Sequence, residues 1–525
     1  GSLTPQVVTV ASLLQEGGYR TMITGKWNVG SEPYNLPDRR GFDLSIIQGD
    51  TGSDNWDPAQ RYLPHSASVQ WFENGKPAQM PKEFYSSAYF VDRMIDYLRS
   101  GQSSGKPFFA YLGFQANHVP LQAPREFIDK YRVRYKDGWT ALRQQRRDRA
   151  AALGLIPKDT PLATMPTTRD WDRLSDKERR YEERRMEVYA GMAEAMDHHV
   201  GRLIEFLRST GEFDNTVFVF LSDNGSEGAD PYANPLGRLW LDLNYSRDID
   251  RLGGKGAYSV IGPSWASAAV SPLSTFKFYS GEGGIRVPLI ISGAPGTRQG
   301  GIHHAFAHVT DIAPTLLALA GQAPPGEARG GQRIEPMRGA SLLPVLRGEA
   351  DRAHAPDEVI GHELSGNRAL FKGDLKLVSV IPPLGDGAWH LYDVRRDPGE
   401  TRDLKDAMPK EFAQMQADYE AWAQRHGVLP IITIDCNAST RPRRVGSART
   451  WTIAVEAVMN AMLVNPTKRA IGKATARLGT IENTSIEPPN PNAALTMWST
   501  RMVRRWAATS APANEPALST EYKSV

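Results

Sequence analysis

The segment from Leu221 to Gly225 supplies two side chains that could ligate a hard metal ion. Four apolar residues, 217–220, precede it and predict a buried parallel strand that ends at small polar residues. Ligands of open α/β sheets bind just beyond the carboxyl ends of strands. The carboxylate of Asp223 and the amide oxygen of Asn224 are donors suited to Ca²⁺ or Mg²⁺. Asp-Asn-Gly is also a good turn, so this segment alone leaves both interpretations open.

The composition is that of a soluble globular protein with room for two or three domains. Of its 525 residues, 40% are hydrophobic and 23% are charged, and no apolar run is long enough to span a bilayer. A formal charge of +3 is too small to indicate a nucleic-acid or membrane partner. The single cysteine, Cys436, excludes an intramolecular disulfide. No signal peptide opens the chain, which slightly favours a cytoplasmic location, although Gly1-Ser2 resembles a cloning scar.

The elements that must position such a site alternate between helix and strand. Residues 1–345 show amphipathic helical patterns and short apolar strands, which together predict an α/β domain. We expect helices near residues 7–14, 124–150, 183–207 and 311–320, and strands over residues 107–114, 217–220 and 287–292. The arginines of residues 124–150 are expected to form a solvated face.

Two further regions follow this domain. Residues 346–430 change to short strands near 368–371, 375–380 and 389–392, followed by a helix over 409–425, which predicts a small antiparallel C-terminal subdomain. Residues 431–525 hold 12 Lys and Arg against 6 Asp and Glu, and are rich in Pro, Ala, Asn, Ser and Thr. They are expected to form a basic, poorly ordered tail.

Four more segments carry polar residues of chemical interest in a fixed order. They are Gly-Lys-Trp-Asn-Val-Gly at 25–30, Asn-His-Val-Pro at 117–120, Lys277 with Glu-Gly-Gly-Ile-Arg-Val-Pro at 282–288, and Leu-Tyr-Asp with Asp-Pro-Gly-Glu-Thr at 391–401. Together with Asp223-Asn224-Gly225, these segments resemble the motifs of the sulfatases in the alkaline phosphatase superfamily, and most closely those of bacterial arylsulfatases. The resemblance covers residues 3 to about 430. It implies an alkaline-phosphatase-like mixed sheet flanked by helices.

The resemblance also implies a role for each site residue. Lys26 and Lys277 would bind the sulfate group as point charges, and His118 would donate to the substrate and protonate the departing oxygen. Asp223 and Asn224 would hold a divalent ion, most simply Ca²⁺. Taken singly, each lysine is ordinarily a surface residue and the histidine an ordinary loop residue; their common order favours the site.

Three departures from the family pattern bear on activity. The chain contains neither the Cys/Ser-x-Pro-x-Arg motif that yields the formylglycine nucleophile nor the adjacent Asp-Asp pair of the first strand. No formylglycine can therefore form in this chain, and the metal would be held weakly. The segment that holds these two motifs in the family should also include a central strand of the sheet. Without that strand, the neighbouring strands are expected to have unpaired edges. Asn28 stands where the family has a histidine that assists turnover, and an amide cannot take up a proton.

The resemblance thus implies an arylsulfatase-like hydrolase of small-molecule sulfate esters, with phosphate esters as further candidate substrates. The chain would be either a truncated sulfatase or a diverged relative, because it has only some of the family's site residues. Two alternatives stay open: an inactive anion-binding or interaction module, and a phosphodiesterase or phosphonate hydrolase of the same superfamily. His303-His304 and His308 are expected to be surface or capping residues. His198-His199 lies on the charged side of a helix and is not expected to ligate a metal.

Overall fold

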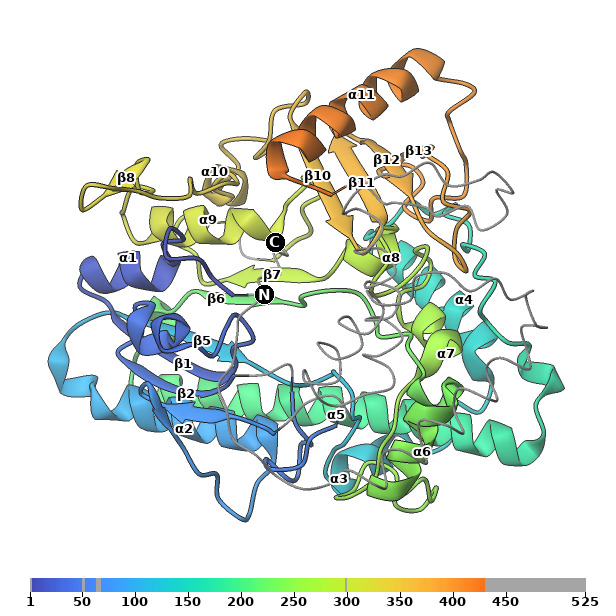
Figure 1. Cartoon of the computed structure of the whole chain (residues 1–525), viewed down its shortest axis with the longest axis horizontal. Helices are drawn as coiled ribbons and strands as arrows, with labels where there is room; N and C mark the ends of the chain where they lie inside the picture. Colours follow the sequence, from blue (N-terminus) through green and yellow to red (C-terminus); the bar gives the residue numbers. More distant parts are fainter. Residues whose placement is uncertain (1, 50–51, 63–67, 298–299, 430–525) are drawn as a thin grey trace, which may run out of the picture. The chain divides into compact units, whose positions relative to one another are not determined.

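A central mixed sheet is formed by strands from residues 20–113. The computed structural model describes residues 2–49, 52–62, 68–297 and 300–429. Its largest sheet has the order β4-β3-β2-β1-β5, in which β1 pairs in parallel with β2 and β5 while β3 and β4 add antiparallel. The strands are β1 (Arg20–Lys26), β2 (Leu44–Gln48), β3 (Trp71–Glu73), β4 (Lys76–Pro77) and β5 (Phe108–Gly113). The expected α/β class is confirmed (Figure 1).

Alternation along β1 and β2 builds a separate core on each face of this sheet. Met22 and Ile46 pack with α2 (Ser86–Ser100) and α5 (Asp176–Ser209), whereas Ile23 and Ile47 pack on the opposite face with α1 (Val10–Glu16). Successive strand residues point to opposite faces, so adjacent apolar residues enter both cores. Strand β1 is consequently almost completely buried, which fixes the position of the residues that follow it.

Strands β6 (Phe218–Leu221) and β7 (Leu289–Ser292) form a separate antiparallel pair. The prediction of a buried parallel strand over residues 217–220 was wrong on both counts, because β6 pairs antiparallel and none of its residues is buried. Among the described residues, β6 has one unpaired edge and β5 has another. Unpaired edges beside the central sheet were expected from the sequence, and the exposure of β6 follows from them.

The remaining helices surround these strands, and most of those expected from the sequence are present. The residues predicted as one helix over 124–150 instead form α3 (Arg125–Ile128) and α4 (Gly138–Ala152). Val133 and Gly138, both with positive φ, interrupt the helix, and Gly138 packs so tightly on the Trp171 ring that a Cβ there would lie 2.2 Å away. The other helices are α6 (Pro235–Asn244), α7 (Gly262–Ala269), α8 (Glu282–Ile285), α9 (Ile312–Leu319) and α10 (Leu343–Arg347). Of the described helices, none is both long and apolar enough to cross a membrane.

The predicted antiparallel C-terminal sheet is present, with strand order β10-β11-β12-β13. Its strands are β10 (Val359–Leu364), β11 (Asn367–Lys372), β12 (Leu375–Ser379) and β13 (His390–Asp393), and α11 (Pro409–His426) packs on one face. A short hairpin, β8 (Ala328–Arg329) and β9 (Gln332–Arg333), precedes it. The tail predicted over residues 431–525 lies outside the described residues.

Candidate active site

The candidate residues lie at the carboxyl ends of β1, β5 and β6 and on one loop after α7. Lys26 is the last residue of β1, and His118 follows β5 in the loop 114–122. Gly25 allows β1 and β5 to approach closely, because it has φ +106° and a Cβ there would lie 2.2 Å from the Gly113 carbonyl oxygen. The parallel pairing of β1 with β5 brings both carboxyl ends to the same edge of the sheet.

The His118 ring is fixed in one orientation by its own loop. Its backbone N–H donates to the Gln115 carbonyl at 2.7 Å, and its Nδ1 lies 2.9 Å from the Val119 carbonyl oxygen. A carbonyl oxygen can only accept, so Nδ1 carries a hydrogen and Nε2 is bare in the neutral ring. Burial first, and then the Lys277 and Lys26 ammonium groups, lower the pKa of His118 to about 4. At pH 7 the unliganded imidazole is therefore neutral.

Lys277 is held at both its backbone and its side chain. The backbone N–H donates to the Ser226 carbonyl at 3.0 Å, and Nζ lies 3.0 Å from Oε2 of Glu227. The Lys277 ammonium group therefore has a carboxylate counterion in the unliganded chain. Glu227 comes four residues after Asp223, so the loop that follows β6 supplies the counterion itself. Sequence reasoning missed this residue, since nothing about a lone glutamate signals such a partner.

Lys26 is the less compensated of the two lysines. Burial lowers the pKa of its ammonium group, the Asp223 carboxylate opposes that effect, and the Lys277 charge adds to it. Within the described part of the chain, no carboxylate lies within ion-pair distance of Lys26. A bound anion would therefore meet a partly desolvated cation here, where electrostatic attraction is stronger than in water.

Asp223 and Asn224 lie just beyond β6, as the sequence predicted. Ser222 donates to the Asn224 carbonyl at 3.0 Å, and Gly225 packs against the Gly283 carbonyl. The Asp223 side chain is exposed and electrostatically coupled to Lys26 and to Tyr111 of β5. Across residues 2–429, leaving out those not described, no three His, Cys, Asp or Glu side chains are grouped to hold a metal ion. The donors present do not fit a complete Ca²⁺ site, which needs six to eight oxygens.

Among the described residues, Asn28 makes no side-chain contact with Lys26, His118 or Lys277. Its side chain is exposed on the loop after β1, its φ is +51°, and the described residues offer it no hydrogen bond. Asparagine tolerates this left-handed conformation better than most residues. The structure therefore accounts for Asn28 as a loop residue, and its catalytic role stays a prediction.

A buried lysine with two carboxylates supports the Lys277 loop from the C-terminal sheet. Nζ of Lys376, on β12, lies 2.9 Å from Glu282 and 2.8 Å from Glu400, and all three side chains are almost fully buried. Glu400 also accepts from the Glu282 backbone N–H at 2.7 Å and from Ser274. The sequence motifs contained both glutamates, but no signal in the sequence identified Lys376 as their partner.

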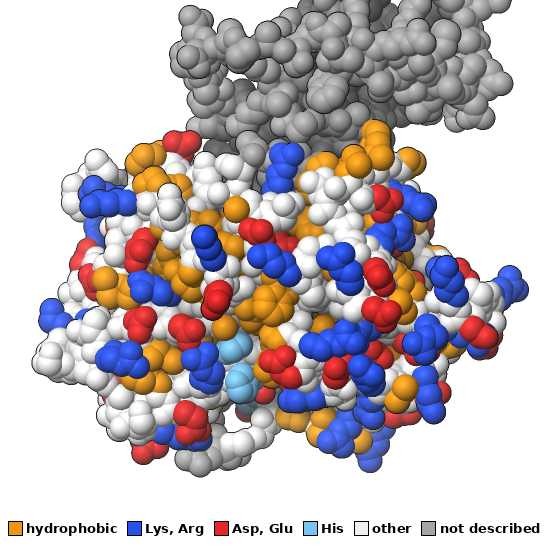
Figure 2. Space-filling view, turned by 90° about the horizontal axis from the view of Figure 1, so that it is seen from below, with side chains coloured by type: hydrophobic (Ala, Val, Ile, Leu, Met, Phe, Trp, Pro, Cys, Tyr) orange, Lys and Arg blue, Asp and Glu red, His pale blue; other side chains and the backbone are white. Residues whose placement is uncertain are grey.

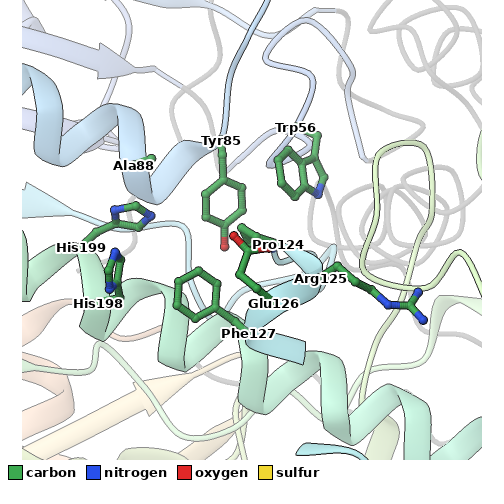
Figure 3. A pocket seen from close by; sticks show the side chains of 9 residues that line it. All are labelled: Trp56, Tyr85, Ala88, Pro124, Arg125, Glu126, Phe127, His198 and His199. Carbon is green, nitrogen blue, oxygen red and sulfur yellow. The ribbon is translucent and has the colours of Figure 1, made fainter. Parts of the chain in front are cut away.

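A cavity elsewhere in the described part of the chain contains none of the predicted site residues. It has a volume of about 430 Å³ and is lined by Trp56, Tyr85, Ala88, Pro124, Arg125, Glu126, Phe127, His198 and His199 (Figure 3). His199, on the charged side of α5, is buried, and burial lowers its pKa to about 4. On the face shown in Figure 2, histidine side chains appear among interspersed acidic and basic ones.

Comparison with known proteins places this arrangement in a family. The sequence model of the family described as Sulfatase matches residues 1–322. An uncharacterized sulfatase of Schizosaccharomyces pombe is 36% identical over 434 residues, which cover 80% of this chain and 78% of the relative. The chain belongs to the sulfatase family. The resemblance carried by the ordered motifs is thereby confirmed, and Lys26, His118, Asp223 and Lys277 all fall within the matched residues.

Further sulfatase relatives agree with this assignment. An arylsulfatase of Klebsiella aerogenes is 34% identical over 347 residues, covering 65% of this chain and 74% of the enzyme. The crystal structure of Ps i-CgsB in complex with k-i-k-neocarrahexaose aligns with a TM-score of 0.54 and 22% identity, over 81% of this chain and 75% of that one. The structural likeness supports the fold alone.

Proposed function

We propose that this member of the sulfatase family binds small sulfate esters, aryl sulfates in particular, and hydrolyses them slowly. The observation that supports the proposal most directly is the coupling of Lys26 and Lys277 to His118. These residues come from three distant segments, yet the two ammonium groups lie close enough to depress the pKa of the imidazole. Lys277 is already paired with Glu227, whereas Lys26 has no carboxylate at ion-pair distance among the described residues. A bound anion would therefore offset chiefly the Lys26 charge, which is costly to hold in a partly buried place.

In this proposal, the sulfate oxygens face Lys26 and Lys277, and the ester oxygen faces Nε2 of His118. The bound anion counters the charges that depress the His118 pKa, so the ring takes up a proton at Nε2. Water then forms the new S–O bond and releases a proton to solvent, while the S–O bond to the aryl oxygen breaks and His118 protonates that oxygen. The expected role of His118 as an acid therefore depends on substrate binding.

Turnover of a chromogenic aryl sulfate tests the proposal. We expect the Lys277→Ala substitution to lower the rate by about 10²–10³-fold, because it removes a charge directed at the developing anion. Lys255→Ala, at an exposed lysine that lines a separate cavity, is the matched control and should leave the rate unchanged. Undiminished turnover in both Lys277→Ala and His118→Ala would refute this site.

Two other functions make different predictions in the same assay. A non-catalytic anion-binding module would use the cluster of Lys26, Lys277 and His118 for binding alone. It predicts no turnover of any ester but sulfate binding that depends on Lys26 and Lys277. A phosphodiesterase or phosphonate hydrolase predicts faster turnover of the matching phosphate diester, since sulfuryl and phosphoryl groups are both tetrahedral. Assaying both esters at saturation ranks the three functions.

Divalent metal binding is expected to be weak. Asp223 and Asn224 would be the protein ligands, and a bound Ca²⁺ would supply electrostatic stabilisation of the substrate's anionic oxygens. With only these two donors, water would fill most of the coordination shell. We expect Ca²⁺ to be removed by dialysis against a chelator, as measured by elemental analysis, and Asp223→Asn to abolish what binds. Stoichiometric metal that survives the chelator would contradict this expectation.

A further inference from the structure

The cavity lined by Trp56 and Tyr85 has aromatic walls, and the polar atoms of those walls are already hydrogen-bonded (Figure 3). The two rings pack with their centroids 4.7 Å apart and their planes at 38°. The Trp56 indole N–H donates to the Gly253 carbonyl at 3.1 Å. The Tyr85 hydroxyl donates to the Gln122 carbonyl at 3.3 Å. Because both donors are occupied, these two side chains offer a ligand chiefly aromatic surface.

The loop that carries Trp56 is held by a buried carboxylate. The backbone N–H groups of Trp56 and Asp57 donate to one oxygen of Asp54, at 2.8 and 2.9 Å. The Gln122 side chain donates to the other oxygen at 2.6 Å, and both Asp54 and Gln122 are almost fully buried. The aromatic wall is therefore formed before a ligand arrives, which lowers the entropic cost of binding.

Glu126 on α3 adds a negative charge beside these rings. Burial chiefly, and then the Glu126 charge, raise the pKa of Tyr85, so the carboxylate lies close to the Tyr85 hydroxyl. In Figure 3, the Glu126 side chain extends from α3 toward Tyr85. No cation of the described residues lies within ion-pair distance of this carboxylate. The cavity thus carries a carboxylate that lacks a counterion within the described part of the chain.

The basic side chains that line the cavity do not supply that counterion. Arg125 donates to the Asp129 carboxylate at 3.1 Å and to the Asp250 carbonyl at 3.0 Å. Figure 3 shows its guanidinium group directed away from the aromatic rings. Burial and the Arg202 charge lower the pKa of His199 to about 4, so this ring is neutral at pH 7. The aromatic surface and the Glu126 charge together suit a cation.

We propose that this cavity binds the quaternary ammonium group of a small molecule. The faces of aromatic rings attract such a cation, and its methyl groups pack on the rings without needing a hydrogen-bond acceptor. Glu126 supplies the opposite charge. A metal ion fits poorly, because it needs several oxygen ligands and Glu126 is the one carboxylate among the described lining residues. This inference does not depend on ester hydrolysis, since the cavity contains none of the candidate active-site residues.

Saturation-transfer NMR on the methyl protons of tetramethylammonium, with the full chain, tests the proposal. We expect saturable binding, and binding about tenfold weaker for tert-butanol, a neutral molecule of similar size. Glu126→Gln should weaken tetramethylammonium binding about tenfold, because it removes the charge but keeps the shape. Trp56→Leu should weaken it about three- to tenfold, because leucine keeps an apolar surface without a π face. Glu420→Gln, at an exposed glutamate on α11, is the matched control and should bind normally.

Three results would overturn the proposal. Equal binding of tert-butanol would show that the cavity acts through apolar contact alone. Unchanged affinity in Glu126→Gln, which alters an exposed side chain and should leave the fold intact, would remove the assigned counterion. Tighter binding of benzoate than of tetramethylammonium would assign the cavity to an aromatic anion.

Phosphatidylcholine vesicles distinguish a lipid head group from a free ligand. We expect the chain not to cosediment with them, because Arg125, Glu126 and Lys130 on and beside α3 are exposed charged residues rather than apolar ones. Cosedimentation that tetramethylammonium abolishes would overturn the assignment to a small molecule.

Discussion

Replacing Lys376 with methionine is expected to destabilise the folded protein by about 3–5 kcal/mol. Lys376 is fully buried, and its ammonium group lies within 3 Å of Glu282 and Glu400. Although burial acts to lower it, the two carboxylates raise the pKa of Lys376. Methionine fills similar space but leaves two buried carboxylates without a counterion. Urea unfolding followed by circular dichroism measures the change.

A nearby lysine provides the matched control for this variant. Lys372 on β11 pairs with Asp418 at 2.8 Å, but its side chain is 30% exposed, so Lys372→Met should cost about 1 kcal/mol or less. Burial raises the pKa of Glu400 in the native protein. When the pKa of a carboxyl group is higher in the folded state than in the unfolded state, the protein loses stability as the pH rises through that folded-state pKa. The loss of stability caused by Lys376→Met should therefore be smaller at pH 5 than at pH 8. Equal costs for both lysine variants would contradict the role assigned to the triad.

Inorganic sulfate is expected to bind more tightly as the pH falls. The pKa of His118 is lowered to about 4 in the unliganded chain, and a neighbouring anion should raise it. Between those two pKa values, each unit of falling pH should strengthen binding by up to about tenfold, because the complex holds one more proton than its components. Calorimetry at several pH values, in two buffers of different ionisation enthalpy, measures both affinity and proton uptake.

Substitutions of two histidines separate this effect from general electrostatics. His118→Asn should remove the proton uptake and flatten the pH dependence. His198→Asn, which changes an exposed histidine of the separate cavity, should retain both. An unchanged slope in His118→Asn would show that another group takes up the proton.

Much of the fold followed from patterns within short stretches of sequence. The apolar stripe of α5 has a clear helical period, and the predicted strands near 368–371, 375–380 and 389–392 correspond to β11, β12 and β13. The failures have identifiable causes. Residues 124–150 contain enough helix-forming side chains for one helix, but Gly138 must pack on Trp171 from a distant segment. Likewise, the apolar run of β6 signals burial, whereas its neighbours determine whether the strand is covered.

The candidate site could likewise be predicted only in part from the sequence. The order of the motifs predicted Lys26, His118 and Lys277, and the structure brings these three within electrostatic reach of one another. Their protonation states could not be predicted, because the His118 pKa depends on burial and on lysines about 90 and 160 residues away in sequence. The ion pair between Lys277 and Glu227 was equally hidden, since it joins two loops that meet only in the folded chain.

The contact of Glu282 with Glu400 also has a consequence for the time order of folding. The two residues are separated by 118 positions, and the hydrogen bond between them helps to fix the loop that carries Lys277. Contacts of such long sequence separation close late, after their loop entropy has been overcome. During synthesis, the ribosome must release Glu400 before that loop can reach its final arrangement. The anion-binding lysines would then be among the last parts of the nascent chain to become organised.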